Sequence, residues 1–323
     1  MKKKIFHYLL ILLACCLLQP ASGQCVLGAL SKELLDPNTT QEFKNFIKNN
    51  PEGMNAYGKY LVNPYLRKDV DVLTATADFM TNHPDYLRDF PGKFDDILEN
   101  LKRAGARCNI CPPGGNKGIP PMHQAISDLD WAWATFKEGN VDVHKLFTEM
   151  AANYQKADGG AYMLSVLRTN ALQDQNYVRS ITSFEYQFLE DGRFEADLVR
   201  EIDNKRYLSE FKSWKSETWA GFSTTEKYVN QFKAYVRSGD KIEYIANVSK
   251  LSGETNPLQY VRQQFVKAIK NNAEELYDSN RSFFSNIILD GKKVKIDNFN
   301  DIIINCNKEE FINSSLFDFV KVL

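Results

Sequence analysis

The sequence predicts a mixed fold of helices and strands, an α+β or α/β arrangement behind an all-α N-terminal region. Apolar residues in the first part of the chain recur at helical spacing, for example Leu27, Leu30 and Leu34. Residues 184–214 instead contain three β-like runs separated by turn sequences. Helical spacing then returns, so helices follow a group of strands, as in domains that pack helices on a sheet.

The N-terminus has the features of an export signal. Residues 2–4 are lysines, residues 5–18 form an almost unbroken apolar run, and residues 21–23 are small. This order is typical of a signal peptide cleaved before Gln24, and the apolar run is short for a membrane span. We therefore expect residues 1–23 to be a signal peptide and the mature chain to be secreted, with no stable membrane span. A lipid anchor is the alternative, on Cys15, Cys16 or Cys25.

Four cysteines would remain in the mature chain: Cys25, Cys108, Cys111 and Cys306. An even number of cysteines in an exported chain favours disulfides, and four cysteines allow three pairings. The spacing of Cys108 and Cys111 also occurs in redox and zinc sites. However, the Pro-Pro-Gly-Gly sequence at 112–115 cannot continue a helix, and only scattered cysteines and histidines remain as further zinc ligands. We therefore expect structural disulfides.

The charges of the chain are nearly balanced, with a formal net charge of −1. This balance excludes a strongly basic nucleic-acid coat, and the 43% hydrophobic content excludes wholesale disorder. Residues 205–270 differ from the rest, because they contain 12 Lys and Arg against 6 Asp and Glu. A local excess of positive charge favours contact with phosphates.

Residues 24–155 are predicted to form a helical N-terminal region, and residues 156–323 a second domain. Asn-Pro pairs at 50–51 and 63–64 and the His-Pro pair at 83–84 mark helix ends, because a residue before proline is pushed out of the α conformation. The Gly- and Pro-rich residues 107–122 are the expected linker. Helices are expected at 123–136, 143–154 and, after the turn sequence Asp158-Gly159-Gly160, at 161–172.

The second domain begins with the three β-like runs. We expect strands at residues 184–188, 194–202 and 207–214, with turns at 190–192 and 203–206. Helices are expected at 225–236 and 257–277, and two short strands at 284–289 and 301–304.

The hairpin around residues 203–206 places charged residues on one face. If this turn is symmetric, the numbers of paired residues sum to 409, so Asp197 lies opposite Lys212 with Glu210 as the diagonal neighbour. Side chains alternate along a strand, and therefore all three point to the same face. Diagonal neighbours lie roughly 7–8 Å apart, near enough for two carboxylates to share a Mg²⁺ ion. The alternative is an ordinary set of cross-strand ion pairs on a solvated face.

The helix that follows the hairpin adds two polar side chains. Gln231 and Tyr235 are four residues apart, so they share one face of that helix.

Three segments together resemble the PD-(D/E)xK nucleases, in the RecB-like branch with a Gln-x-x-x-Tyr helix. They are Glu195-Ala196-Asp197, the run from Ser209 to Trp214, and Gln231-Phe232-Lys233-Ala234-Tyr235. The resemblance implies a restriction-endonuclease-like αβββαβ core and metal-dependent hydrolysis of the phosphodiester bonds of nucleic acid, with DNA favoured. By position, Asp197 and Glu210 would hold Mg²⁺ or Mn²⁺ with the Phe211 carbonyl, Lys212 would be the catalytic lysine, and Gln231 and Tyr235 would support the site and the substrate.

One feature of that family is missing from its expected place. Many members carry a further acid on the helix before the first strand, but residues 160–165 contain no carboxylate. Glu185 or Glu195 could substitute for this acid. Its absence weakens the expectation of a second metal ion more than the expectation of the reaction.

The chain also resembles secreted polymorphic toxins, in its N-terminal helical breaks and in residues 118–129. That resemblance implies action on foreign cells and an immunity protein as partner. Two rival functions stay open: a catalytically inactive nuclease fold that binds nucleic acid or protein, and a secreted helical binding module.

Overall fold

The computed structural model describes residues 69–90, 92–106, 119–139, 141–188 and 194–323, with the single positions 37, 41, 44 and 45. The expected signal peptide, the helix ends at 50–51 and 63–64, most of the linker, and Cys25, Cys108 and Cys111 lie outside these residues. Within the described part of the chain, no helix is both long enough and apolar enough to cross a bilayer.

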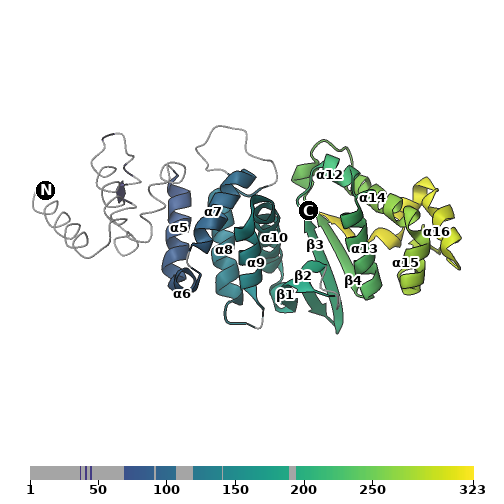
Figure 1. Cartoon of the computed structure of the whole chain (residues 1–323), viewed down its shortest axis with the longest axis horizontal. Coiled ribbons are helices and arrows are strands. Elements are labelled where there is room, and N and C mark those ends of the chain that lie inside the picture. Colours follow the sequence, from purple (N-terminus) through teal and green to yellow (C-terminus); the bar gives the residue numbers. More distant parts are fainter. Residues whose placement is uncertain are drawn as a thin grey trace, which may run out of the picture.

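Seven helices precede the first strand among the described residues (Figure 1). Asp69 caps the first of them by accepting hydrogen bonds from the amides of Asp71 and Val72. Pro84 ends that helix and begins the next, as the His-Pro pair predicted. The helices are α5 (Val70–Asn82), α6 (Pro84–Asp89), α7 (Lys93–Ala104), α8 (Met122–Phe136), α9 (Val143–Ala152), α10 (Tyr154–Gln173) and α11 (Gln175–Ser180).

Helix α10 is longer than predicted, since it runs through Asp158-Gly159-Gly160, where a turn was expected. Gly160 lies against α9, and a Cβ atom there would come within 2.5 Å of Met150 Cγ. The glycine therefore permits close helix packing and does not break the helix. The domain boundary proposed between residues 155 and 156 falls in the first turn of α10.

The three predicted strands are present and form an antiparallel meander, β1 (Ile181–Gln187), β2 (Glu195–Ile202) and β3 (Lys205–Lys212). Two helices follow, α12 (Ser216–Ala220) and α13 (Glu226–Ser238), before a strand that the sequence analysis missed, β4 (Lys241–Ala246). Strand β4 lies parallel to β3, and β7 (Val320–Val322) lies parallel to β4. The sheet order is β1-β2-β3-β4-β7.

The C-terminal third is mainly helical. The predicted helix at 257–277 is divided at Asn272 into α14 (Pro257–Asn271) and α15 (Ala273–Ser279). The strand expected at 301–304 was wrong: these residues belong to α16 (Phe299–Cys306), which starts with a capping box between Asn298 and Asp301. Of the strand expected at 284–289, only β5 (Ile288–Leu289) forms, paired with β6 (Lys292–Lys293). Short 3₁₀ turns complete this part: Val248–Leu251, Arg281–Phe284, Glu309–Asn313 and Ser315–Phe317.

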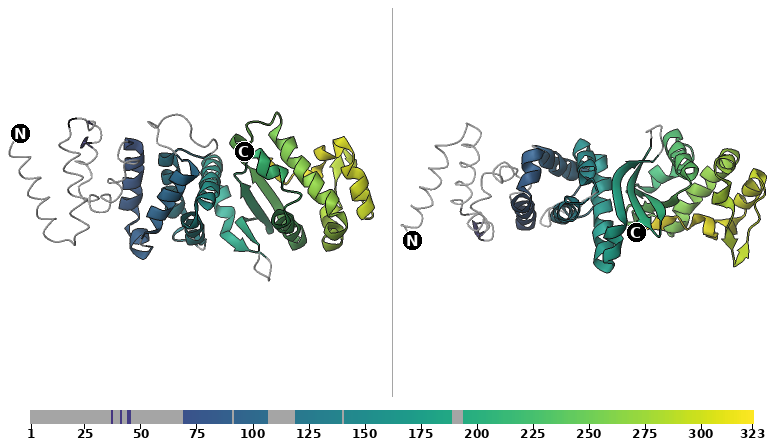
Figure 2. Two further views of the ribbon diagram at one scale, coloured as in Figure 1. Left: turned by 45° about the horizontal axis from the view of Figure 1, so that its top comes forward. Right: turned by 90° about the horizontal axis from the view of Figure 1, so that it is seen from below.

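The sheet separates two hydrophobic cores. Helices α5 to α10 lie on one side of it and helices α13 to α16 on the other (Figures 1 and 2). The first core joins those N-terminal helices to Phe184, Leu198 and Phe211 of the sheet. The second core joins Leu208 and Tyr244 to the later helices. Both faces of the sheet are therefore buried, as expected for a sheet between helical layers.

Cys306 is one of the four cysteines expected to form disulfides, and it is not paired. It lies at the end of α16 as a buried free thiol. Burial raises the pKa of this thiol to about 12, so it is protonated and unreactive at neutral pH. Pairing among the other three cysteines stays a prediction.

Candidate active site

The β2–β3 hairpin has a tighter turn than predicted. Asp203 and Asn204 both have positive φ angles, 51° and 56°, and form a two-residue turn closed by the pair Ile202 and Lys205. Paired numbers therefore sum to 407, and the predicted register of 409 was wrong by two residues. A shift of two residues by itself keeps each side chain on its face, and Glu210 and Lys212, two apart on β3, share one face. Continued past Leu198 and Ser209, the register sets Asp197 opposite Glu210 and not opposite Lys212.

The side chain of Asp197 replaces a backbone hydrogen bond between β2 and β3. The paired positions of β2 and β3 end at Leu198 and Ser209, although both strands continue. Beyond that pair, the carboxylate of Asp197 accepts a hydrogen bond from the Phe211 amide, at 2.7 Å from Oδ2 to N. A side chain thus satisfies a donor that the neighbouring strand would otherwise satisfy.

In β1 and β2, the alternation of side chains between the two faces of the sheet is broken near Asp197. On β1 and β2, Phe184 and its partner Leu198 pack in the first core, whereas Ala196 packs in the second. The residue between Phe184 and Tyr186 is Glu185, whose φ of 45° is unusual for a side-chain-bearing residue. This kink brings the buried Glu185 opposite Asp197 in the β1–β2 register. Local departures from regular pairing often redirect a side chain next to an active site.

Glu210 is the centre of the hydrogen-bond network. Its Oε1 accepts hydrogen bonds from Lys212 Nζ and from Gln231 Nε2, the latter at 2.9 Å. Its Oε2 accepts a hydrogen bond from the hydroxyl of Tyr235. Glu210 is 2% exposed, so the hairpin charges do not form a solvated face. The structure therefore brings together the residues that the sequence singled out.

The charged groups of the site lie close together and shift one another's pKa values. Burial and then the charge of Glu210 raise the pKa of Asp197 well above its ordinary value. Burial and then the charge of Asp197 raise the pKa of Glu185 in the same way. Burial lowers the pKa of Lys212, but Glu210 and Asp197 outweigh it and raise the pKa overall, so Lys212 is an ammonium. Three carboxyl groups share one region and repel one another, which favours a further positive charge there.

Helix α10 adds a second lysine that the sequence analysis did not identify. Lys156 pairs with Glu149 of α9 at 2.7 Å. Burial lowers its pKa, but the hydrogen bond to Glu149 and the charges of Glu185 and Asp197 raise it overall. No sequence pattern marks Lys156, because its position depends on how α10 packs against the sheet. A cavity of about 640 Å³ lies beside Glu149 and Glu185, lined by α9, β1 and Glu195.

A carboxylate lies close to the residues where the helix acid was sought. Asp158 belongs to α10, which α11 separates from β1, and it precedes residues 160–165. It bonds to Lys250 Nζ at 2.9 Å and to the Ser213 hydroxyl at 2.9 Å, directly after Lys212. Of the two suggested substitutes, Glu185 adjoins Asp197, whereas Glu195 is bonded to Gln187 at the strand edge.

Asp197 and Glu210 suit a magnesium ion as a pair. Mg²⁺ is bound by one or two carboxylates and keeps several waters, so it needs few protein ligands. Burial, and then the charge of Glu210, raise the pKa of Asp197 although Lys212 and Lys156 lower it, so a bound cation would stabilise its charged form. The described residues contain no group of three or more His, Cys, Asp or Glu placed to hold a metal ion. A metal ion on Asp197 and Glu210, with the Phe211 carbonyl, stays a prediction.

The chain matches no protein-family model, no curated protein and no solved structure.

Proposed function

We propose that the protein is a metal-dependent nuclease of the PD-(D/E)xK type, with residues 156–323 carrying the chemistry. The observation that supports this most is the contact of Glu210 with Lys212 and with both polar residues of α13, while Asp197 lies near enough to Glu210 and Lys212 for their charges to shift its pKa. The order of elements supports the proposal: a helix, three antiparallel strands, the helices α12 and α13, and a strand parallel to the third. An αβββαβ core of the kind that the resemblance implies would have its elements in a similar order.

Asp197 and Glu210 would hold Mg²⁺ or Mn²⁺, which supplies Lewis-acid activation of water and charge stabilisation when bound. Tyr235 and Gln231 fix the orientation of Glu210, because each donates to a different oxygen of its carboxylate. The Phe211 amide fixes Asp197. Ligands held by second contacts keep their geometry and bind a metal more tightly.

In the metal-free protein Lys212 is a cation. Its pKa is raised, so its ammonium group keeps its proton at neutral pH. It lies over the ring of Trp214, 4.8 Å from the ring centroid, which limits its motion. From this position it would donate a hydrogen bond to the attacking water or to a phosphate oxygen, stabilising the negative charge that develops there.

The proposed substrate is nucleic acid, with DNA favoured. We propose further that the chain is secreted and acts as a toxin, with an immunity protein as its partner. The excess of Lys and Arg in residues 205–270 supports contact with phosphates, since these residues include β3 and α13.

Plasmid degradation by the mature protein tests the proposal, with Mg²⁺, with Mn²⁺ and with EDTA. We expect cleavage that EDTA abolishes and that Lys212→Ala lowers by roughly 10²–10⁴-fold. Lys292→Ala is the control, because Lys292 is exposed on β6, outside residues 205–270. Cleavage that persists in both Lys212→Ala and Asp197→Ala would remove this site from the mechanism.

A binding protein with the same fold but no activity is the second candidate. It is favoured by one observation: both oxygens of Glu210 already accept hydrogen bonds from Lys212, Gln231 and Tyr235. A carboxylate so engaged can serve the fold alone. Absence of any change in Tm with 10-fold dilution series of Mg²⁺ and Mn²⁺, together with inactivity on DNA and RNA, would favour this candidate.

A further inference from the structure

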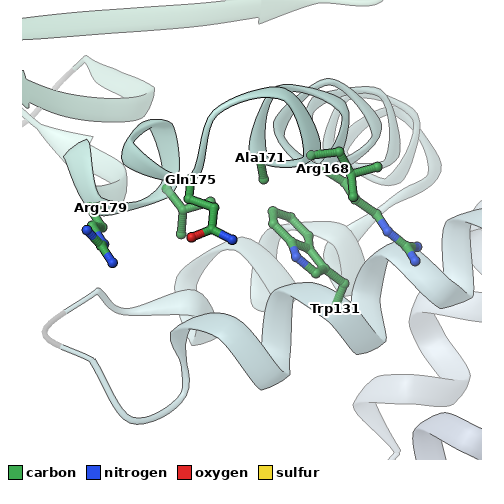
Figure 3. Close-up of a pocket in the computed structure, with 7 residues that line it drawn as sticks. Trp131, Arg168, Ala171, Gln175 and Arg179 are labelled. Carbon is green, nitrogen blue, oxygen red and sulfur yellow. The ribbon is translucent and has the colours of Figure 1, made fainter.

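A second cavity lies away from the carboxylates, between helices α8, α10 and α11. Its volume is about 410 Å³. Figure 3 shows the indole of Trp131 in the middle, Ala171 above it, Gln175 and Arg179 toward one end, and Arg168 at the other. Its lining consists of Trp131, Arg168, Ala171, Leu172, Gln175, Val178 and Arg179.

The lining combines an aromatic face with two guanidinium groups. The Trp131 indole and the aliphatic side chains give the cavity an apolar lining. Arg168, which is paired with Asp128, and Arg179 lie at its two ends, and the cavity lining includes no acidic residue (Figure 3). A nucleotide offers the same pair of features, because its base stacks on an aromatic ring and its phosphates pair with arginine.

Arg168 is held in place from behind. It donates hydrogen bonds to Asp128 at 2.8 Å and to the Ser127 hydroxyl at 2.9 Å, and its side chain is 31% exposed. Asp128 is itself buried. Arg179 is exposed, and the described residues include no ion-pair partner for it. One arginine is thus fixed at the site, and the other is available to a ligand.

The cavity adjoins the strand that leads to the carboxylates. Helix α11, which carries Gln175 and Arg179, is followed directly by β1, and Glu185 is the fifth residue of that strand. Four residues of strand span about 13 Å. The cavity and Glu185 thus belong to consecutive elements of the chain.

We propose that the Trp131 cavity binds one unpaired base of a nucleic-acid strand, with Arg179 and Arg168 on its flanking phosphates. The inference rests on the proposed nuclease function and deepens it, because a base can stack on Trp131 only when it is out of a duplex. The substrate is therefore a single strand, or a duplex with a frayed or single-stranded end.

The test measures binding separately from cleavage. The Asp197→Asn protein is mixed in EDTA with a fluorescein-labelled 12-nucleotide DNA or RNA that carries 5-iodouracil, and with the corresponding blunt duplex. Anisotropy gives the affinity, and ultraviolet crosslinking with peptide mass spectrometry gives the contact. In this background, Trp131→Ala should weaken single-strand binding about tenfold, and Arg179→Gln about threefold with a shallower salt dependence. Arg281→Gln, an exposed arginine of the C-terminal part, is the control and should leave the affinity unchanged.

The two proposals can fail independently. A crosslink to Trp131 with no cleavage by the wild type supports the cavity and removes the nuclease. Cleavage without a crosslink to Trp131, and with equal affinities for the Trp131→Ala, Arg179→Gln and Arg281→Gln proteins, overturns the cavity alone. Equal binding of the blunt duplex and the single strand also overturns it. Because Arg179 is exposed, its variant keeps the test valid even if Trp131→Ala fails to fold.

Discussion

The hydroxyl of Tyr235 donates a hydrogen bond to Oε2 of Glu210 and so joins helix α13 to strand β3 inside the protein. Gln231, one turn earlier, donates to the other oxygen of the same carboxylate. The sequence motif Gln-x-x-x-Tyr thus has a physical meaning in this chain: both residues hold one acid in place.

Replacing Tyr235 with Phe should weaken metal binding by roughly 10- to 100-fold, because the carboxylate loses the contact that orients it. Titration calorimetry with Mn²⁺ measures the effect. Tyr260→Phe removes a comparable hydroxyl, which bonds to the Ser216 carbonyl at 2.7 Å, and is the matched control. Equal Mn²⁺ affinities in the two variants would contradict a supporting role for Tyr235.

Replacing Asp197 with Asn should stabilise the metal-free protein and abolish its response to metal. The charge of Asp197 is buried beside that of Glu210, and its removal relieves the repulsion. Asn can still accept the hydrogen bond from Phe211. At pH 8 we expect a Tm at least roughly 2 °C above wild type in EDTA, and no further rise with Mg²⁺. A lower Tm in EDTA would show that the carboxylate is not under electrostatic strain.

The stability of the metal-free protein should fall as pH rises from the ordinary carboxyl range, about 4, to alkaline values. Glu185 and Asp197 have raised pKa values in the folded chain, so the folded state binds more protons than the unfolded state over this window. Stability is then lost as pH rises through the folded-state values. Urea titrations measure the free energy of unfolding at each pH. Glu185→Gln should lose less stability than wild type as pH rises, whereas Glu195→Gln should behave as wild type.

Mg²⁺ should reverse that trend. Metal ligands must be deprotonated, so the rise in Tm caused by Mg²⁺ is expected to be larger at pH 8.5 than at pH 6. Thermal scans at both pH values, with and without 10-fold excess EDTA, measure it. A rise of the same size at both would indicate that Mg²⁺ binds away from Glu185 and Asp197.

The two adjacent glycines of α10 should respond in opposite ways to alanine. Gly160→Ala introduces a Cβ 2.5 Å from Met150 Cγ, so it should cost about 1–3 kcal/mol in the free energy of unfolding. Gly159 has nothing within 4 Å of a new Cβ, and Gly159→Ala should stabilise the helix by up to about 1 kcal/mol. Denaturant unfolding compares the pair. Destabilisation of equal size would mean that helix packing around Gly160 is not the cause.

The nearness of these side chains could be predicted because they are close in sequence. Asp197, Glu210 and Lys212 belong to one hairpin, and an error of two residues in its register does not by itself move a side chain to the other face. The turn itself was misjudged, since Asp203-Asn204 forms a two-residue turn while the following Lys205 and Arg206 belong to the strand.

Other parts could not be predicted, because they depend on contacts between distant segments. Strand β4 is six residues long, and its place in the sheet comes from pairing with β3 and β7. Residues 301–304 have the isoleucines of a strand, but the capping box at Asn298 decides for a helix. Lys156 lies near the site because α10 packs against β3, and Glu185 lies beside Asp197 because of the kink in β1.

The apolar face that β1, β2 and β3 turn toward the N-terminal helices has one more consequence. Phe136 of α8 packs against Phe184, and Tyr162 of α10 against Phe211, so side chains of the helical layer complete the interior of the sheet. A gene fragment that encodes the sheet without these helices would produce a chain that exposes an apolar face of the sheet to solvent. A truncated or fused form of the protein must therefore keep these helices together with the strands that they cover.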